Sequence, residues 1–112
     1  MIMEMNNFHN QPLQVPDGWI TVYNEFPDID PAKIKDNTDI LWDNFTEDLL
    51  PIKNEHKNII LDLGWYPEMN PNGNYCIKLI KDNTWEKPLI TINNKSKDEI
   101  VKIIEDILLN NV

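Results

Sequence analysis

The sequence predicts an α+β domain, in which an antiparallel sheet of about four strands packs against a C-terminal amphipathic helix, with one further short helix. Two observations carry this prediction. Residues 58–92 contain three segments of alternating apolar and polar residues, separated by turn signals. Residues 96–108 then carry a helix cap followed by an apolar stripe at helical spacing. A length of 112 residues fits a single domain, residues 1–112, that needs no disulfide or metal ion.

The N-terminal quarter predicts an irregular segment and one strand. Residues 1–18 are polar and are interrupted by Pro12 and Pro16, so we expect an irregular conformation there. Residues 19–26 follow a turn signal and are rich in β-branched and aromatic side chains, which predicts the first strand. Asp30 followed by Pro31 is a typical start of a short helix.

Residues 38–50 (TDILWDNFTEDLL) are compatible with two structures. Leu41, Phe45 and Leu49 recur at helical spacing, whereas residues 45–52 also read as a strand. We favour a helix over residues 38–45, followed by a short strand. Burial of unpaired carboxylates is unfavourable, so the acids of this segment are expected to lie largely on the surface. These acids are Asp39, Asp43, Glu47 and Asp48.

The central region predicts a three-stranded meander. Alternation places one almost wholly apolar set of side chains on one face of its first strand: Ile59, Leu61, Leu63 and Trp65. The other face receives Ile60, Asp62, Gly64 and Tyr66. Pro71-Asn72-Gly73 predicts a hairpin turn to the second strand, whose apolar side carries Tyr75, Ile77 and Leu79. In the third strand, residues 88–93, Ile90 and Ile92 mark the buried side.

The C-terminal helix begins at a capping box formed by Ser96 and Glu99. Its stripe of large aliphatic side chains consists of Ile100, Ile103, Ile104, Ile107 and Leu108. Full burial of each such side chain contributes roughly 1.5–3 kcal/mol, which exceeds the contribution of the cap. The helix is therefore expected to pack across the apolar face of the meander.

The net charge of −9 is unevenly distributed. Residues 1–50 hold ten carboxylates and two lysines, for a net charge of −8, while residues 51–112 hold nine carboxylates and eight lysines, for a net charge of −1. The chain contains no arginine, the residue that grips phosphate in two places. An acidic surface repels nucleic acid and attracts basic proteins, although a merely solvated surface is the simpler interpretation. We therefore expect no nucleic-acid partner.

Other motifs exclude function classes. The segment from Glu68 through Asn70 and Asn72 to Gly73 matches half of a calcium loop, but Leu79 occupies the position of the essential Glu, which favours a hairpin turn. The two histidines lack ligand spacing, so we expect no metal site and no cofactor. No arrangement of a nucleophile or paired carboxylates indicates catalysis, and we expect a protein that is not an enzyme.

The expected location is the cytoplasm. Cys76 is the single cysteine, so no intramolecular disulfide can form, and it is expected to be a small core side chain. The first five residues lack the pattern of a signal peptide, and no apolar stretch reaches membrane-spanning length. Trp19 and Trp65 fit strand positions. Trp42 lies among acids, where core packing and an interface anchor are equally good interpretations.

Four segments within residues 40–110 resemble small immunity proteins of bacterial polymorphic toxin systems, including contact-dependent growth inhibition. They are FTEDLL at residues 45–50, LDLGWYP at residues 61–67, PNG at residues 71–73 and WEKPL at residues 85–89. These motifs are structural rather than catalytic. The resemblance implies a cytoplasmic antitoxin that binds the C-terminal domain of a cognate toxin, often a basic nuclease, in a 1:1 complex and blocks its active site.

The leading hypothesis is therefore an inhibitor whose acidic face imitates the phosphates that the toxin binds. The residues expected to bind toxin form two patches. The first consists of Asp39, Trp42, Asp43, Glu47 and Asp48, and the second, on the hairpin tip, of Glu68, Asn70 and Asn72. The alternative is a small acidic adaptor or regulatory domain, unrelated to toxins, that adds an edge strand or a helix to a larger assembly.

Overall fold

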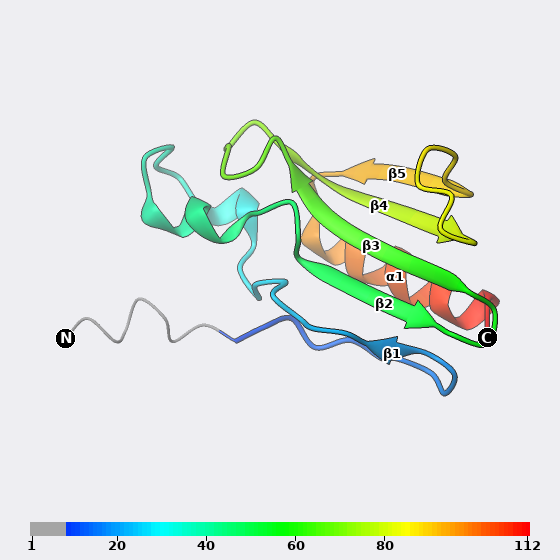
Figure 1. The fold of residues 1–112 in the computed structure, drawn as a ribbon. Helices are drawn as coiled ribbons and strands as arrows, with labels where there is room; N and C mark the ends of the chain where they lie inside the picture. The colour runs from blue at the N-terminus through cyan, green and yellow to red at the C-terminus, as the bar shows by residue number, and fades with distance from the viewer. Residues whose placement is uncertain (1–8) are drawn as a thin grey trace.

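The computed structural model describes residues 9–112, in which one five-stranded antiparallel sheet carries a single α-helix on one face (Figure 1). The strands lie in the sheet in their chain order, from β1 to β5. This arrangement confirms the predicted α+β class, and the five strands fall in the five segments for which strands are predicted, where the sheet was expected to have about four. The elements are β1 (Ile20–Thr21), the 3-10 helices η2 (Pro31–Lys33) and η3 (Ile40–Asn44), β2 (Leu50–Asn54), β3 (Ile59–Tyr66), β4 (Asn74–Lys81), β5 (Ile90–Asn94) and α1 (Lys97–Asn110).

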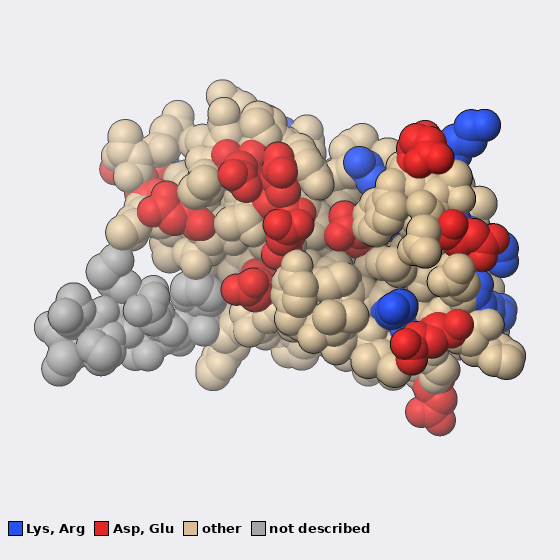
Figure 2. Space-filling model, viewed as in Figure 1, with Lys and Arg blue, Asp and Glu red and all other residues tan. Residues whose placement is uncertain are grey.

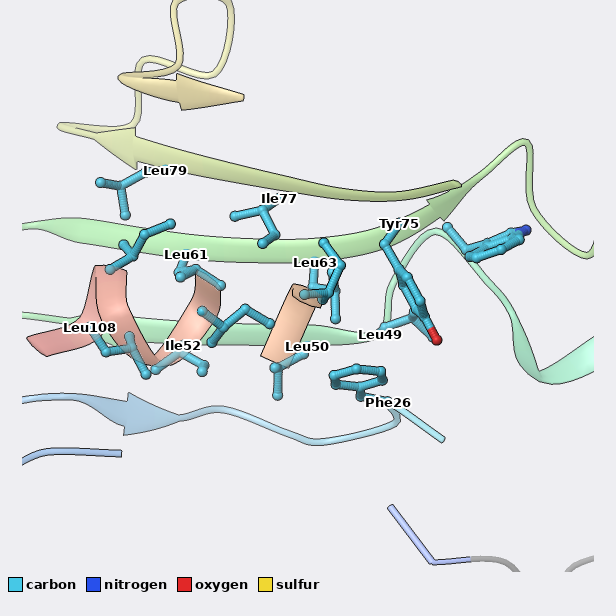
Figure 3. Packing of buried hydrophobic residues seen from close by; sticks show 14 of the residues in the cluster. Phe26, Leu49, Leu50, Ile52, Leu61, Leu63, Tyr75, Ile77, Leu79 and Leu108 are labelled. Atoms are coloured by element: carbon cyan, nitrogen blue, oxygen red, sulfur yellow. The ribbon is translucent and has the colours of Figure 1, made fainter. Parts of the chain in front are cut away.

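The alternation of the meander is confirmed by the strand register. Leu61 of β3 lies between Ile52 of β2 and Leu79 of β4, and Leu63 is opposite Ile77 in the same way. All of these side chains point to the face that α1 covers, and they are at most 2% exposed (Figure 3). The helix contributes Ile100, Ile104, Ile107 and Leu108 to this core, while Ile103 is only partly buried. An amphipathic helix on an apolar sheet face is thus the main source of hydrophobic burial.

An aromatic cluster extends the core beyond the N-terminal end of α1. The Trp65 ring lies edge-on to Tyr75 with centroids 4.9 Å apart, and Phe45 approaches Trp65 at 5.1 Å. Trp42 packs against both Phe45 and Trp65. Phe26 completes the cluster through an edge contact with Tyr75. Such pairs add to the area that the rings bury, so the segment that holds η3 is fixed by its aromatic side chains.

The predicted first strand is confirmed only in part. Regular pairing with β2 covers Ile20–Thr21, although the N–H groups of Val22 and Glu25 also donate to the β2 side, to the carbonyls of Pro51 and Leu49. Residues 9–16 are irregular, as predicted, apart from a bridge to Pro27. The expectation for residues 1–8 lies outside the described residues.

The two short helices are 3-10 turns with aspartate caps. The Asp30 side chain accepts a hydrogen bond from the Ala32 N–H at η2, and the Asp39 side chain accepts one from Leu41 N–H at η3, each at 2.9 Å. The helix favoured for residues 38–45 therefore exists as a shorter and tighter turn, and the short strand that follows it is β2. In residues 9–112 no helix combines the length and apolarity that crossing a membrane requires.

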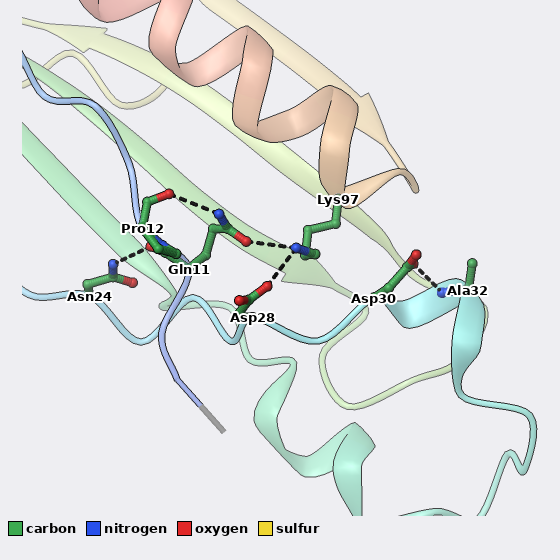
Figure 4. Close-up of polar contacts among 7 residues, drawn as sticks. All are labelled: Gln11, Pro12, Asn24, Asp28, Asp30, Ala32 and Lys97. Atoms are coloured by element: carbon green, nitrogen blue, oxygen red, sulfur yellow. Dashed lines mark hydrogen bonds and ion pairs between the residues drawn. The ribbon is translucent and has the colours of Figure 1, made fainter. Parts of the chain in front are cut away.

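Lys97 links the start of α1 to the N-terminal segment (Figure 4). Its Nζ donates to Asp28 Oδ1 at 2.8 Å and to Gln11 Oε1 at 2.7 Å. The helix itself begins as predicted, with Ser96 Oγ accepting from the Glu99 N–H. The Ser96 N–H is satisfied by Asn94 Oδ1 instead of by Glu99. Segments about 70 to 86 residues apart in sequence are thereby held together at one end of the helix.

Candidate protein-binding surface

The face of the sheet opposite α1 carries no helix in the described part of the chain, and we call it the open face (Figure 1). Strand register identifies its side chains. One row across four strands consists of Ile20, Lys53, Ile60 and Ile80. Two residues further along β3, Asp62 is paired with Pro51 on one side and with Lys78 on the other. Each of them alternates with a residue of the α1-covered face. Thr91 of β5 is the register partner of Lys78, so all five strands contribute to the open face.

Glu47 and Asp48 reach the surface through an irregularity between β2 and β3. The Leu49 N–H donates to the carbonyl of Leu63, while the Trp65 N–H donates to the carbonyl of Thr46. The two bonds leave two residues, Glu47 and Asp48, opposite the single residue Gly64, which is the arrangement of a β-bulge with one extra residue. A Cβ atom at Gly64 would overlap the carbonyl oxygen of Glu47, so only glycine admits this approach. Both acids are exposed.

The hairpin tip lies beside this bulge. Glu68 Oε1 accepts a long hydrogen bond, 3.4 Å, from the Glu47 N–H, so the two predicted acidic patches meet here. Asn70 serves the turn itself: its carbonyl accepts from Trp65 Nε1 at 2.8 Å, and its Oδ1 accepts from the Asn72 N–H. The calcium-loop pattern is thus a hairpin turn, as predicted, with Asn70 oxygens used inside it. Asn72 is exposed.

Further carboxylates extend the bulge into an acidic strip, which we define as Asp43, Glu25, Asp48, Glu47, Glu68 and Asp62. Glu25 and Asp43 line one shallow hollow, together with Thr46. The charges of Asp48 and Asp62 both act on Tyr23 and on Tyr66, which places these four side chains within electrostatic reach of one another. Figure 2 shows acidic side chains gathered near the end of the sheet where η3 leads into β2.

The open face also perturbs its own titrating groups. Burial raises the pKa of Asp62, and the charge of Asp48 raises it further, while Lys78 acts in the opposite direction. Burial likewise raises the pKa of the Tyr66 hydroxyl to about 12, with Asp62 and Glu47 adding to the shift. The pKa of the Tyr23 hydroxyl is raised as well, so Tyr23 and Tyr66 both remain neutral hydrogen-bond donors at physiological pH.

Two predicted site residues have local structural roles. Trp42 is only 5% exposed and belongs to the aromatic cluster, so it is a core residue, and its contact with a toxin stays a prediction. Its edge contributes to a small depression shared with Trp65 and Pro71. Asp39 caps η3, as described above, and lies apart from the bulge in sequence and in the hydrogen-bond pattern.

Sequence reasoning missed Tyr23, Asp62 and Tyr66 as candidates. The signal was present for two of them, because strand alternation already separated Asp62 and Tyr66 from the apolar face. Tyr23 had no such signal, since the chain leaves regular strand geometry after Thr21. No family model, no curated protein and no solved structure matches the chain. The surface must therefore be interpreted from its own geometry.

The other reactive groups and hollows of the described chain do not form an evident catalytic or metal-binding site. Burial raises the pKa of the Cys76 thiol, which keeps it a poor nucleophile. Within residues 9–112 no three potential metal-binding side chains come together. A larger hollow lies between residues 14–16 and the end of α1, where Glu105 accepts a hydrogen bond from the Gln14 N–H and Leu109 is 61% exposed. The open face combines charge, aromatic rings and exposed apolar side chains.

Proposed function

We propose that this protein is an immunity protein, which binds the C-terminal domain of a cognate toxin in a 1:1 complex and occludes its active site. The observation that carries the proposal is the acidic strip, which brings both predicted patches together around the Glu47 and Asp48 bulge. A nuclease that binds phosphates presents a basic cleft, and a strip of carboxylates complements that cleft in charge. The chain contains no arginine that could pair with these carboxylates through two hydrogen bonds.

Occlusion explains why no catalytic arrangement is needed. The inhibitor acts by complementary charge, which speeds encounter with the toxin, and by desolvated contacts, which slow dissociation. The acids at the bulge are held by backbone hydrogen bonds rather than by a free loop, so their positions are preorganised for binding. Preorganisation lowers the entropy lost on association.

The test is co-expression with the C-terminal domain of the toxin encoded next to the gene. We expect rescue of growth and a co-purifying complex whose affinity falls steeply as salt is raised. The double variant Glu47→Lys with Asp48→Lys should weaken the complex at least tenfold. A matched control, Asp98→Lys with Asp106→Lys on the exposed side of α1, should change it less than twofold. Absence of a tight complex with any linked toxin rejects the proposal.

One observation favours the adaptor as the second candidate function. Strand β5 pairs with β4 on one side, and no other described strand pairs with its second edge. Trp85 and Leu89, in the connection that precedes β5, are 47% and 57% exposed. An added strand from a larger assembly could use this edge. Purification from the native cell with a partner that is neither toxic nor basic would favour this function over the first.

A further inference from the structure

The open face has an apolar margin. Ile20 and Val22 are 56% and 59% exposed, and the neighbouring Tyr23 is 41% exposed. Ile20 is aligned with Ile60 through Lys53, and the Val22 N–H is bound to the carbonyl of Pro51, the partner of Asp62. Large exposed apolar side chains grouped beside charged ones are typical of protein interaction surfaces.

Asp62 lies at the centre of the same face without a partner. It is half-buried and paired in register with Lys78, yet its carboxylate makes no hydrogen bond or ion pair with any residue that the structure describes. The Lys78 Nζ lies instead over the ring of Tyr66, 5.7 Å from its centroid. Burial raises the pKa of Asp62, and the charge of Lys78 lowers it without forming an ion pair, so burial of this carboxylate is only partly compensated in the isolated protein. A cation supplied by a partner would remove this penalty.

The charge of this carboxylate reaches the hydroxyl groups of Tyr23 and Tyr66 and raises the pKa of both. Both tyrosines feel the charges of Asp62 and Asp48, so these four groups form one cluster on the open face. The position of Lys78 shows that the Tyr66 ring accepts a cation over its face. Arginine suits such a cluster better than lysine, because its planar group binds a carboxylate through two hydrogen bonds and stacks on aromatic rings.

We propose that the open face around Asp62, Tyr23 and Tyr66 is the docking surface for a basic protein, and that an arginine side chain of this partner pairs with Asp62 and stacks on a tyrosine ring. Ile20 and Val22 form the apolar margin of this contact, and the acidic strip forms its charged rim. The inference rests on the proposed function for the identity of the partner, the toxin domain. Beyond that function, the inference specifies that the open face binds the toxin domain and that an arginine of this domain is recognised.

The first experiment does not need the toxin. The full-length protein, labelled with ¹⁵N and with ¹³C at its carboxyl groups, is titrated with blocked tetra-arginine, and blocked tetra-lysine serves as the comparison. We expect the largest shifts at Asp62, Tyr23 and Tyr66, with arginine binding at least threefold tighter than lysine. The variant Asp62→Asn, which keeps the shape of the side chain, should lose most of the shift. Shifts centred elsewhere, equal binding of the two peptides, or no binding would overturn the inference.

The second experiment uses the complex with the toxin domain. Asp62→Asn and Tyr23→Ala should each weaken it at least tenfold, whereas Asp106→Asn and Trp85→Ala should change it less than twofold. Equal unfolding midpoints show that a weakened variant is still folded. A complex that forms with undiminished affinity in Asp62→Asn and Tyr23→Ala rejects the docking face and leaves the proposed function standing. Failure of the wild-type protein to form any complex rejects the function, while the peptide titration still decides the face.

Discussion

The carbonyl oxygen of Glu47 lies over Gly64, in the space that a Cβ atom would occupy. This contact closes the bulge between β2 and β3, because the neighbouring residues on both sides are tied by backbone hydrogen bonds. A glycine is required here by packing, since its φ is not in the left-handed region. The acidic strip therefore depends on a residue that carries no charge.

Replacement of this glycine tests the bulge. Gly64→Ala should lower the free energy of unfolding by about 1–3 kcal/mol, because the methyl group overlaps backbone that cannot move freely. Urea denaturation measures the change. Thr91→Ala, at an exposed position of β5, is the control and should stay within about 0.5 kcal/mol of the wild type. A Gly64→Ala protein as stable as the wild type would contradict the close approach.

The pH dependence of stability tests the environment of Asp62. Burial and Asp48 raise its pKa in the folded protein above the ordinary value of 3.8, so the folded state binds this proton more tightly than the unfolded state. The contribution of Asp62 to stability therefore falls as the pH rises from that ordinary value through the raised pKa. The variant Asp62→Asn cannot ionise at this position, so it does not lose this stability as the pH rises. It should be more stable than the wild type at pH 7, on the order of 0.5 kcal/mol, and the difference should shrink in acid.

Unfolding curves of the wild type and of Asp62→Asn at several pH values measure the difference in stability between them. The other carboxylates are present in both proteins, so their contributions to this difference cancel. Asp106→Asn, at an exposed position of α1, serves as the control and should show no such trend. An Asp62→Asn protein that is less stable than the wild type at pH 7 would indicate that attraction to Lys78 outweighs burial.

Burial distinguishes the tryptophans. Trp42→Ala should lower the free energy of unfolding by about 3–5 kcal/mol, because it empties part of the aromatic cluster. Trp85 is 47% exposed, and Trp85→Ala should change stability by about 0.5 kcal/mol or less. Denaturation followed by circular dichroism measures both. A Trp42→Ala protein that is as stable as the wild type but binds toxin poorly would show that Trp42 contacts the toxin instead of stabilising the core.

Lys97 provides a local test of the N-terminal segment. Lys97→Met removes its hydrogen bonds to Asp28 and Gln11 and should lower stability by about 1 kcal/mol. Amide exchange should speed up at Gln11 and Asp28, whose N–H groups bond across this segment. Lys102→Met, at an exposed position of the same helix, should leave that exchange unchanged. Unaltered exchange in Lys97→Met would show that the segment is held by other contacts.

Much of the fold could be predicted because its signals are periodic. The meander and α1 were predicted from alternation and from a capping box, which depend only on neighbouring residues, and Ile100 and Leu61 are buried as expected. The stretch around η3 was harder, because 3-10 turns have no strong period and propensity competes there with aromatic packing. The same packing placed Trp42 in the core.

Sequence alone determined the α+β class, the order of the strands along the chain, the face that the helix covers and the excess of acid in the first half. These properties follow from local patterns and from composition. Tertiary structure alone decided that Glu47 and Glu68 meet, that the Asp62 carboxylate has no ion pair in the described chain and that its charge reaches Tyr23. Such relationships depend on register and on one bulge, where an offset of a single residue changes which side chains share a face.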